Sequence, residues 1–142
     1  MLFGIGSCKD KGPSQAEIDQ ILIEQYIADN NLETIKTESG LHYIIYKAGD
    51  SLNRPDFYSY IEAKYKGELL DGSVFDDGSV EMSANLNQLI PGWIEGLQLI
   101  GEGGKIMLII PSELGYAGRE QLGIPENSVL VFNIELFQVY NK

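Results

Sequence analysis

The sequence is poor in cysteine and histidine, two residue types that often bond covalently to a substrate or bind zinc. Its 142 residues include one cysteine, Cys8, and one histidine, His42. A disulfide within the chain is therefore impossible, and a zinc site built from histidine and cysteine lacks ligands. A cysteine–histidine pair would require the terminal Cys8 to reach His42. We accordingly expect a function that uses no metal, no cofactor and no covalent intermediate.

Positive charge is also scarce. Ten lysines and arginines stand against 21 aspartates and glutamates, which gives a formal net charge of −11. Such a chain repels phosphate backbones, so we expect no nucleic-acid partner. An anionic membrane surface would repel the chain as well, so any attachment to a membrane must have a cause other than charge.

Met1 to Cys8 form a short apolar stretch that ends in a motif. The stretch is far shorter than the ~20 residues of a membrane-spanning helix, and shorter than a complete secretory signal. Its last residues, Ile5-Gly6-Ser7-Cys8, resemble the lipobox of bacterial lipoproteins, in which an aliphatic residue and two small residues precede the lipidated cysteine. The resemblance implies cleavage before Cys8, a lipid on Cys8, and a signal whose start is incomplete here. The alternative is an unmodified start that happens to contain a cysteine.

A helix is predicted after this stretch, from about Gln15 to Asn30. Ser14 and Glu17 have the spacing of a capping box, in which each side chain bonds the backbone amide of the other residue. The following residues place an apolar stripe at helical spacing. The stripe consists of Ile18, Ile21, Leu22 and Tyr26, with Gln25 as its polar member. Because one helix cannot bury a stripe alone, it must pack on its own domain, on a partner or on a second copy, and we expect its own domain.

The periodicity then changes to that of strands. Four β-rich runs follow, at residues 41–46, 57–66, 105–110 and 128–140. An Asp-Gly hairpin turn at residues 70–73 comes after the second run. Between them, residues 87–101 suit a short apolar helix with Pro91 and Gly92 in its first turn. The pattern predicts an α+β domain: a bent antiparallel β-sheet, or half-barrel, of about five strands wrapped around one short helix, with an N-terminal helix appended.

Four aromatic residues are distributed through this domain. Tyr65, Phe75, Trp93 and Phe132 would ordinarily belong to the hydrophobic core of a small domain. Their neighbours permit a more specific interpretation, because five motifs in unbroken order resemble those of FKBP-type peptidyl-prolyl isomerases. The motifs are Tyr65-Lys66-Gly67 with Leu70 to Asp76, Leu89 to Leu97 around Ile90-Pro91-Gly92-Trp93, Gly103 to Pro111, Leu114 to Gly118 with Ile124 to Ser128, and Leu130 to Leu136.

The resemblance implies three segments. Residues 1–8 would be a signal remnant with its lipobox, residues 9–38 a tether with the N-terminal helix, and residues 39–142 the isomerase domain. This arrangement is similar to that of bacterial lipoprotein members of the family with an N-terminal extension. Such a protein would lie in the cell envelope of a bacterium, lipid-anchored at Cys8 and facing the periplasm.

The resemblance also implies an active site, with Asp76, Tyr116 and Ile90 as its catalytic residues. The Ile90 amide and the Tyr116 hydroxyl would each donate to a substrate carbonyl. Asp76 would accept polar contacts at the rim and polarise Tyr65 or the bound amide. The substrate would bind in an apolar pocket with Trp93 as its floor. The pocket would be lined by Tyr65, Phe75, Met82, Leu89, Trp93, Ile124 and Phe132.

The implied activity is cis-trans isomerisation of proline-containing segments in unfolded or exported polypeptides. Rotation about a peptide bond faces a barrier of ~18–20 kcal/mol, which arises from amide resonance. No bond is made or broken, so the scarcity of reactive side chains agrees with this chemistry. The alternative is a non-catalytic chaperone or partner-binding module that uses the same pocket.

The sequence departs from the family pattern beside the predicted pocket. The stretch from Asp76 to Leu86 is short and lacks the usual aromatic residue; Met82 or Ala84 stands near that position. No arginine occurs between Asp76 and Trp93, so the ion pair that some members make to this aspartate has no donor nearby. We therefore expect one pocket wall to be more open than is usual in the family.

Overall fold

The computed structural model describes residues 12–142. Cys8 and the lipobox motif lie outside these residues, so the lipid anchor remains a prediction. None of the helices among the described residues is long and apolar enough to cross a membrane.

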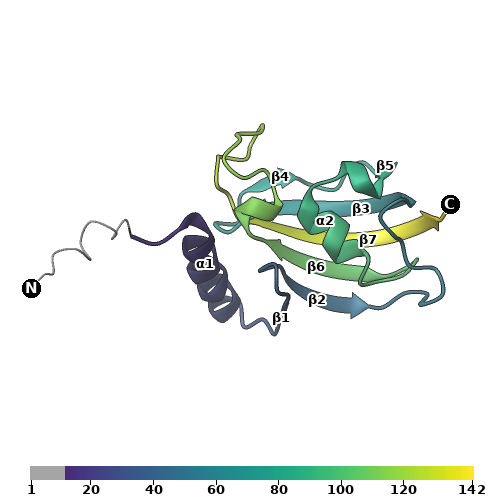
Figure 1. Cartoon of the computed structure of the whole chain (residues 1–142), viewed down its shortest axis with the longest axis horizontal. Coiled ribbons are helices and arrows are strands. Elements are labelled where there is room, and N and C mark those ends of the chain that lie inside the picture. The colour runs from purple at the N-terminus through teal and green to yellow at the C-terminus, as the bar shows by residue number, and fades with distance from the viewer. Residues whose placement is uncertain (1–11) are drawn as a thin grey trace, which may run out of the picture.

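The elements are shown in Figure 1. They are α1 Gln15–Asp29, β1 Ile35–Lys36, β2 His42–Lys47, β3 Tyr60–Leu69, β4 Val74–Asp76, β5 Met82–Asn85, the 3-10 helix η2 Leu86–Gln88, α2 Pro91–Leu97, β6 Lys105–Ile110, the 3-10 helix η3 Ser112–Leu114 and β7 Leu130–Tyr140.

The strands of the described chain form one seven-stranded antiparallel sheet in the order β1-β2-β6-β7-β3-β4, with β5 paired to β3. This confirms the expected bent sheet around one short helix. The expected number of about five strands is too low. The two strands that were missed, β1 and β5, have only two and four residues. Such short strands are stabilised by pairing with a longer neighbour and leave little alternating pattern in the sequence.

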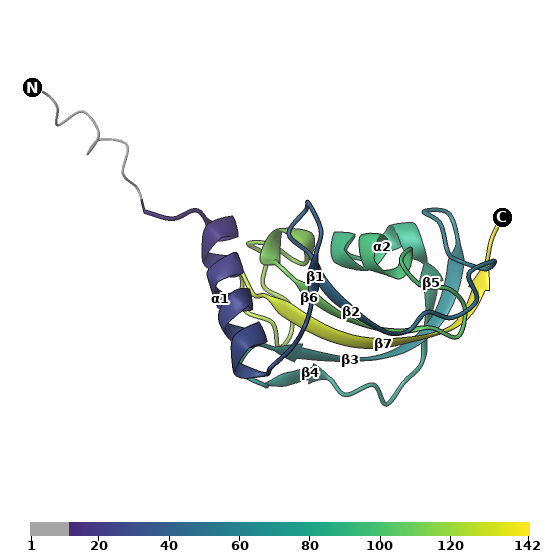
Figure 2. The ribbon, with the colours of Figure 1, turned by 90° about the horizontal axis from the view of Figure 1, so that it is seen from below.

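Alternate residues of β6 and β7 are buried on opposite faces of the sheet, as the period of a strand requires. Leu108 and Phe132 belong to the large core beneath α2. Ile109 and Val131 face the other way and form a smaller core with Ile23 of α1. Figure 2 shows α2 inside the curve of the sheet and α1 across one end. Where α1 lies, both faces of β6 and β7 are therefore covered by helices.

Helix α2 begins with Pro91 at its first turn, as predicted. Proline lacks the amide hydrogen that an uninterrupted helix needs, but it is well accommodated at a helix start. The predicted helical span of 87–101 is consequently divided into η2, which ends at Gln88, and the seven-residue α2.

Two glycines of α2 allow the helix to approach the sheet closely. A Cβ added at Gly92 would lie 2.6 Å from side-chain atoms of Ile110, and one added at Gly96 would lie 2.6 Å from Leu108. Real Cβ atoms do not come so close to a neighbour, so any larger residue would push α2 away from β6. The close approach sets the next residue, Trp93, deep against the core.

Helix α1 has the predicted capping box but docks through a face that was not predicted. The Ser14 side chain accepts from the Glu17 amide at 3.2 Å, and the Glu17 carboxylate accepts from the Ser14 amide at 3.2 Å. The helix packs on its own domain, as expected. However, Ile23 is fully buried, whereas Ile21 and Leu22 of the predicted stripe are 62% and 46% exposed. The predicted stripe is therefore not the buried face.

Polar contacts explain why apolar spacing identified the wrong face. Buried Asp19 accepts hydrogen bonds from the backbone N–H and the hydroxyl of Ser112, at 2.8 and 2.6 Å. Gln20 lies 2.9 Å from Nε2 of His42 through its side-chain oxygen and donates to the Gly40 carbonyl at 2.9 Å. A search for hydrophobic periodicity treats polar residues as exposed. Asp19 and Gln20 nevertheless face the domain, because their side chains have hydrogen-bond partners there.

Replacing Ile23 by alanine tests this docking. The change removes a buried side chain between α1 and the sheet, so the free energy of unfolding should fall by about 2–5 kcal/mol. The matched control Ile21→Ala alters an exposed residue of the same helix and should shift that free energy by less than about 0.5 kcal/mol. Urea denaturation of both variants measures the difference. Equal losses would contradict the assigned face.

His42, the only histidine of the sequence, is buried at the same contact. Nδ1 of its ring lies 3.0 Å from the Thr34 hydroxyl. Burial lowers the pKa of His42, and the positive charge of Lys36 lowers it further, against a smaller opposing effect of Glu24. The folded chain therefore keeps the ring neutral at pH values where an unfolded chain, with a histidine pKa of about 6.5, takes up a proton.

The free energy of unfolding should consequently decrease as pH is lowered through about 6.5 towards the pKa of folded His42, because only the unfolded chain then gains a proton. Above that range this contribution is constant. Urea denaturation at about pH 7.5 and about pH 5.5 should show a larger decrease for the wild type than for His42→Gln, which does not titrate. A ring that titrates at or above about 6.5 in NMR spectra would refute the expectation.

Candidate active site

A cavity of about 380 Å³ opens beside α2. Most of its lining is aromatic or aliphatic, and its few polar groups are spread among several elements. The lining residues are Tyr65, Phe75, Asp76, Met82, Gln88, Leu89, Ile90, Trp93, Tyr116, Gln121, Leu122, Ile124 and Phe132. An apolar concavity with a small number of polar groups is the usual form of a binding site for a small apolar group.

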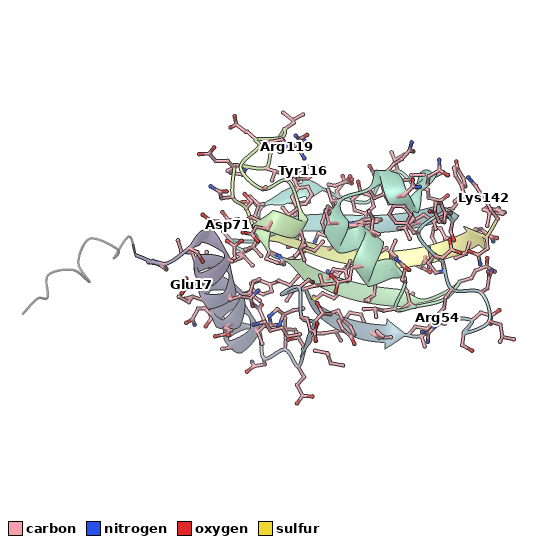
Figure 3. All side chains as sticks on the ribbon, in the orientation of Figure 1. Glu17, Arg54, Asp71, Tyr116, Arg119 and Lys142 are labelled. Carbon is pink, nitrogen blue, oxygen red and sulfur yellow. The ribbon has the colours of Figure 1, made fainter. Side chains whose placement is uncertain are left out.

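Sheet pairing brings the distant parts of this cavity together. Tyr65 of β3 and Phe132 of β7 lie on neighbouring strands of the sheet. Helix α2 adds Trp93, and the loop between η3 and β7 adds Tyr116 and Ile124. Figure 3 marks Tyr116 on that loop, at the end of the sheet nearest α1. The cavity therefore exists only when β3, β7 and α2 are all assembled.

Four aromatic rings form the floor and one wall. Trp93, which is 3% exposed, meets Tyr65 and Phe132 edge-to-face at centroid distances of 4.9 and 5.4 Å. Phe75 packs against Phe132 in the same manner at 5.5 Å. Edge-to-face contacts place the positive edge of one ring on the negative face of another. The rings thus restrain one another, and the floor is formed before any ligand arrives.

Asp76 lies at the rim of the cavity and pairs with Tyr65. Burial raises the pKa of Tyr65, and a hydrogen bond to the Asp76 carboxylate and the charge of that carboxylate raise it further. The Tyr65 hydroxyl therefore keeps its proton and donates to Asp76. The same carboxylate accepts from the Gly78 amide at 3.0 Å. Within residues 12–142 the only ion pair joins Lys66 to Glu68, so Asp76 has no cationic partner there.

The backbone N–H of Ile90 and the hydroxyl of Tyr116 are among the hydrogen-bond donors at the cavity that have no protein acceptor within the described residues. Ile90 is the N-cap of α2 with an extended backbone, so its N–H lies before the hydrogen bonds of the helix begin. Available donors beside an apolar floor suit a compact apolar ring flanked by carbonyl oxygens.

All ten residues predicted for the site line this one cavity, although the roles assigned to them remain predictions. Of the two residues named near the position of the missing aromatic residue, Met82 of β5 lines the cavity and Ala84 does not. Sequence reasoning missed Gln88, Gln121 and Leu122. Gln88 directly precedes the Leu89-Ile90 motif and could have been found from that position. The other two belong to a loop that has no periodic pattern, so no comparable signal identifies them.

Comparison with known proteins agrees with this geometry. The family model for FKBP-type peptidyl-prolyl cis-trans isomerases matches residues 53–137. The FKBP-type peptidyl-prolyl cis-trans isomerase FkpA of Aeromonas hydrophila is 39% identical over 136 residues, which are 92% of this chain and 50% of that protein. FkpA of Escherichia coli is 40% identical over 119 residues, which are 82% of this chain and 43% of that protein. The chain thus spans about half the length of these curated relatives.

Solved structures give the same result. The crystal structure of FkpA from Escherichia coli has a TM-score of 0.78 and 37% identity, and the match covers 88% of this chain and 61% of that one. A peptidyl-prolyl cis-trans isomerase from Pseudomonas syringae pv. tomato has a TM-score of 0.74 and 26% identity, with 92% and 99% covered. The family match covers more than half of the sequence and contains every residue that lines the cavity, and on this evidence the chain belongs to the FKBP-type peptidyl-prolyl cis-trans isomerase family.

Proposed function

We propose that this chain is a peptidyl-prolyl cis-trans isomerase that binds X–Pro segments in the cavity. The observation that supports this most directly is an apolar floor at Trp93 with the Ile90 N–H and the Tyr116 hydroxyl available at its edge. A prolyl ring fits the floor, and the carbonyl groups on either side of it can accept from the two donors. Membership of the family supports the same activity.

Isomerisation requires only that the twisted peptide bond be bound more tightly than the planar one. The barrier of ~18–20 kcal/mol reflects the loss of amide resonance on twisting. A twisted amide carries less charge on its oxygen, so an apolar surrounding favours it relative to the planar form. The rings of Tyr65, Trp93 and Phe132 provide that surrounding, while the two donors hold the flanking residues in a turn. Each ~1.4 kcal/mol of preference accelerates rotation tenfold.

Asp76 completes the site in this proposal. Its carboxylate accepts from Tyr65, which fixes that ring at the wall of the cavity. Its charge lies at the rim and not on the floor, so the apolar surrounding of the twisted bond is preserved. From the rim the Asp76 carboxylate can interact with the bound amide, whose charge distribution changes as the peptide bond twists.

We further propose that the substrates are unfolded or exported proline-containing polypeptides in a bacterial cell envelope, and that a lipid on Cys8 anchors the protein facing the periplasm. The support is the lipobox-like motif Ile5-Gly6-Ser7-Cys8, together with a net charge of −11 that disfavours attachment to anionic lipids by charge. The tether after Cys8 would allow the domain to reach chains in solution.

A second candidate function is non-catalytic binding of unfolded segments in the same cavity. Leu122 favours it, because this side chain is 100% exposed on the loop that borders the cavity. Met82 favours it as well, because a flexible thioether adapts to apolar groups of varied shape better than a rigid ring does. The two functions differ in whether binding changes the rate of rotation.

A protease-coupled assay with an X–Pro peptide, and a refolding assay limited by proline isomerisation, test the proposal. The folded chain should accelerate both. Tyr116→Phe and Asp76→Ala should lower kcat/KM by about 3- to 30-fold with little loss of stability, because each removes a hydrogen-bonding group at the cavity. Trp93→Ala should also lower the free energy of unfolding, by about 3–5 kcal/mol.

Two exposed residues outside the cavity provide matched controls for this assay, and Tyr58→Phe and Asp77→Ala should leave kcat/KM unchanged. Uncatalysed rates from a folded wild type would overturn the isomerase proposal, and retention of unfolded chains by the same sample would support the second candidate. Equal unfolding by the three cavity variants would mean that these residues serve only the core.

Mass spectrometry of the mature protein, extracted from native membranes, tests the anchor. We expect an N-terminal Cys8 that carries a lipid, and release of the Cys8→Ser protein from the membrane fraction. An unmodified Cys8 behind an intact Met1 would exclude the anchor.

A further inference from the structure

We propose that Asp19 of α1 is a positioning residue for the active site: through Ser112 it fixes the backbone that carries Tyr116. The structural part of this proposal stands alone, whereas its kinetic consequence rests on the proposed isomerase function. Asp19 lies outside residues 53–137, the segment that matches the family model. The proposal thus gives the N-terminal helix a part in the site.

Asp19 is a carboxylate that is 0% exposed. An ionised carboxylate is costly to bury unless its oxygens are hydrogen-bonded. Oδ2 accepts from both the backbone N–H and the hydroxyl of Ser112, at 2.8 and 2.6 Å. Oδ1 accepts from the side-chain amide of Gln15 at 2.8 Å. Asp19 therefore keeps its two bonds to Ser112 only while α1 is docked on η3, and it holds Ser112 by both of that residue's donors.

Ser112 in turn holds the residues on both sides of Tyr116. The Ser112 carbonyl accepts from the Gly115 amide at 3.0 Å and from the Ala117 amide at 2.8 Å. The backbone before and after Tyr116 is thus tied to a single carbonyl. Any displacement of Ser112 is transmitted to the Tyr116 side chain, whose hydroxyl lies at the cavity.

The conformation of Ala117 makes the loop depend on this support. Ala117 has φ 53° and Asn127 has φ 57°. Alanine rarely adopts this left-handed conformation, which persists only where the surroundings hold it. The Asn127 amide donates to the Ala117 carbonyl at 2.7 Å. A continuous series of hydrogen bonds therefore runs from Asp19 through Ser112 and Ala117 to Asn127, and the strained backbone at Ala117 would relax if its first link were lost.

Amide hydrogen exchange of the full chain tests the structural part. Asp19→Ala should raise the exchange rates of the Ala117 and Asn127 amides by about tenfold or more relative to amides of β6 and β7, because it removes charge-assisted hydrogen bonds that hold Ser112. Asp19→Asn keeps an acceptor for Ser112 and should restore most of the protection. The control Ile21→Ala alters an exposed side chain of α1 and leaves both its docking and Ser112 untouched, so it should leave the relative rates unchanged.

The isomerase assay tests the kinetic part. Asp19→Ala should lower kcat by about 3- to 10-fold with little change in KM, since the apolar floor is untouched while the Tyr116 donor is misplaced. Asp19→Asn should stay near the wild type. If Asp19→Ala does not fold, Ser112→Ala removes the hydroxyl link alone and should change exchange and kcat in the same direction, by less.

Each outcome decides one claim. Unchanged relative exchange at Ala117 in the Asp19→Ala or Ser112→Ala variants, or an equal increase in Ile21→Ala, would overturn the positioning role whatever the activity. A wild type without isomerase activity would overturn the proposed function and leave the exchange result valid. Loss of kcat in Asp19→Ala together with rescue by Asp19→Asn would support both.

Discussion

Neighbouring residues of β6 and β7 face opposite sides of the sheet, and at the end of the sheet near α1 neither side is left to water. Leu108 and Phe132 pack beneath α2, whereas Ile109 and Val131 pack beneath α1 with Ile23. Removing either helix would return apolar surface to solvent at a cost of roughly 25 cal/mol per Å². This two-sided burial makes α1 part of the same packed unit as the sheet. It also accounts for the two glycines of α2, since a helix that must seal the concave face has to approach it closely.

The chemistry of the cavity follows from that packing. Because α2 lies so close to the sheet, Trp93 is set among Tyr65 and Phe132, and the rings leave an apolar floor with almost no freedom to rearrange. Polar groups remain only at the edge, where Asp76 accepts from Tyr65. A site of this kind acts by its surroundings and not by a reactive group, which is consistent with a sequence that has one cysteine and one histidine.

The sequence predicted the position of a residue correctly where the local structure accepts only one type of residue. Trp93 and Phe132 are recognisable because the ring cluster requires aromatic residues at those positions, and Pro91 because it starts a helix. It was uninformative where a distant partner decides burial. Asp19 is buried only because Ser112 satisfies it, so the apolar stripe predicted for α1 lay on the wrong face. The short strands β1 and β5 and the rim residue Leu122 were missed for a similar reason: pairing or loop geometry sets their places, not periodicity.

The position of β7 has a consequence for how the chain folds. It is the last element in sequence, yet it lies between β6 and β3, which do not pair with each other. Tyr60 pairs with Tyr140 and Lys105 with Glu135, so the main ladders close only when β7 is in place. Contacts so distant along the chain form slowly, and until they form β3 and β6 each present an unpaired edge on which other chains can add. Until residues 130–140 enter the sheet, two strand edges are therefore open to other chains, and the insertion of this single strand closes both.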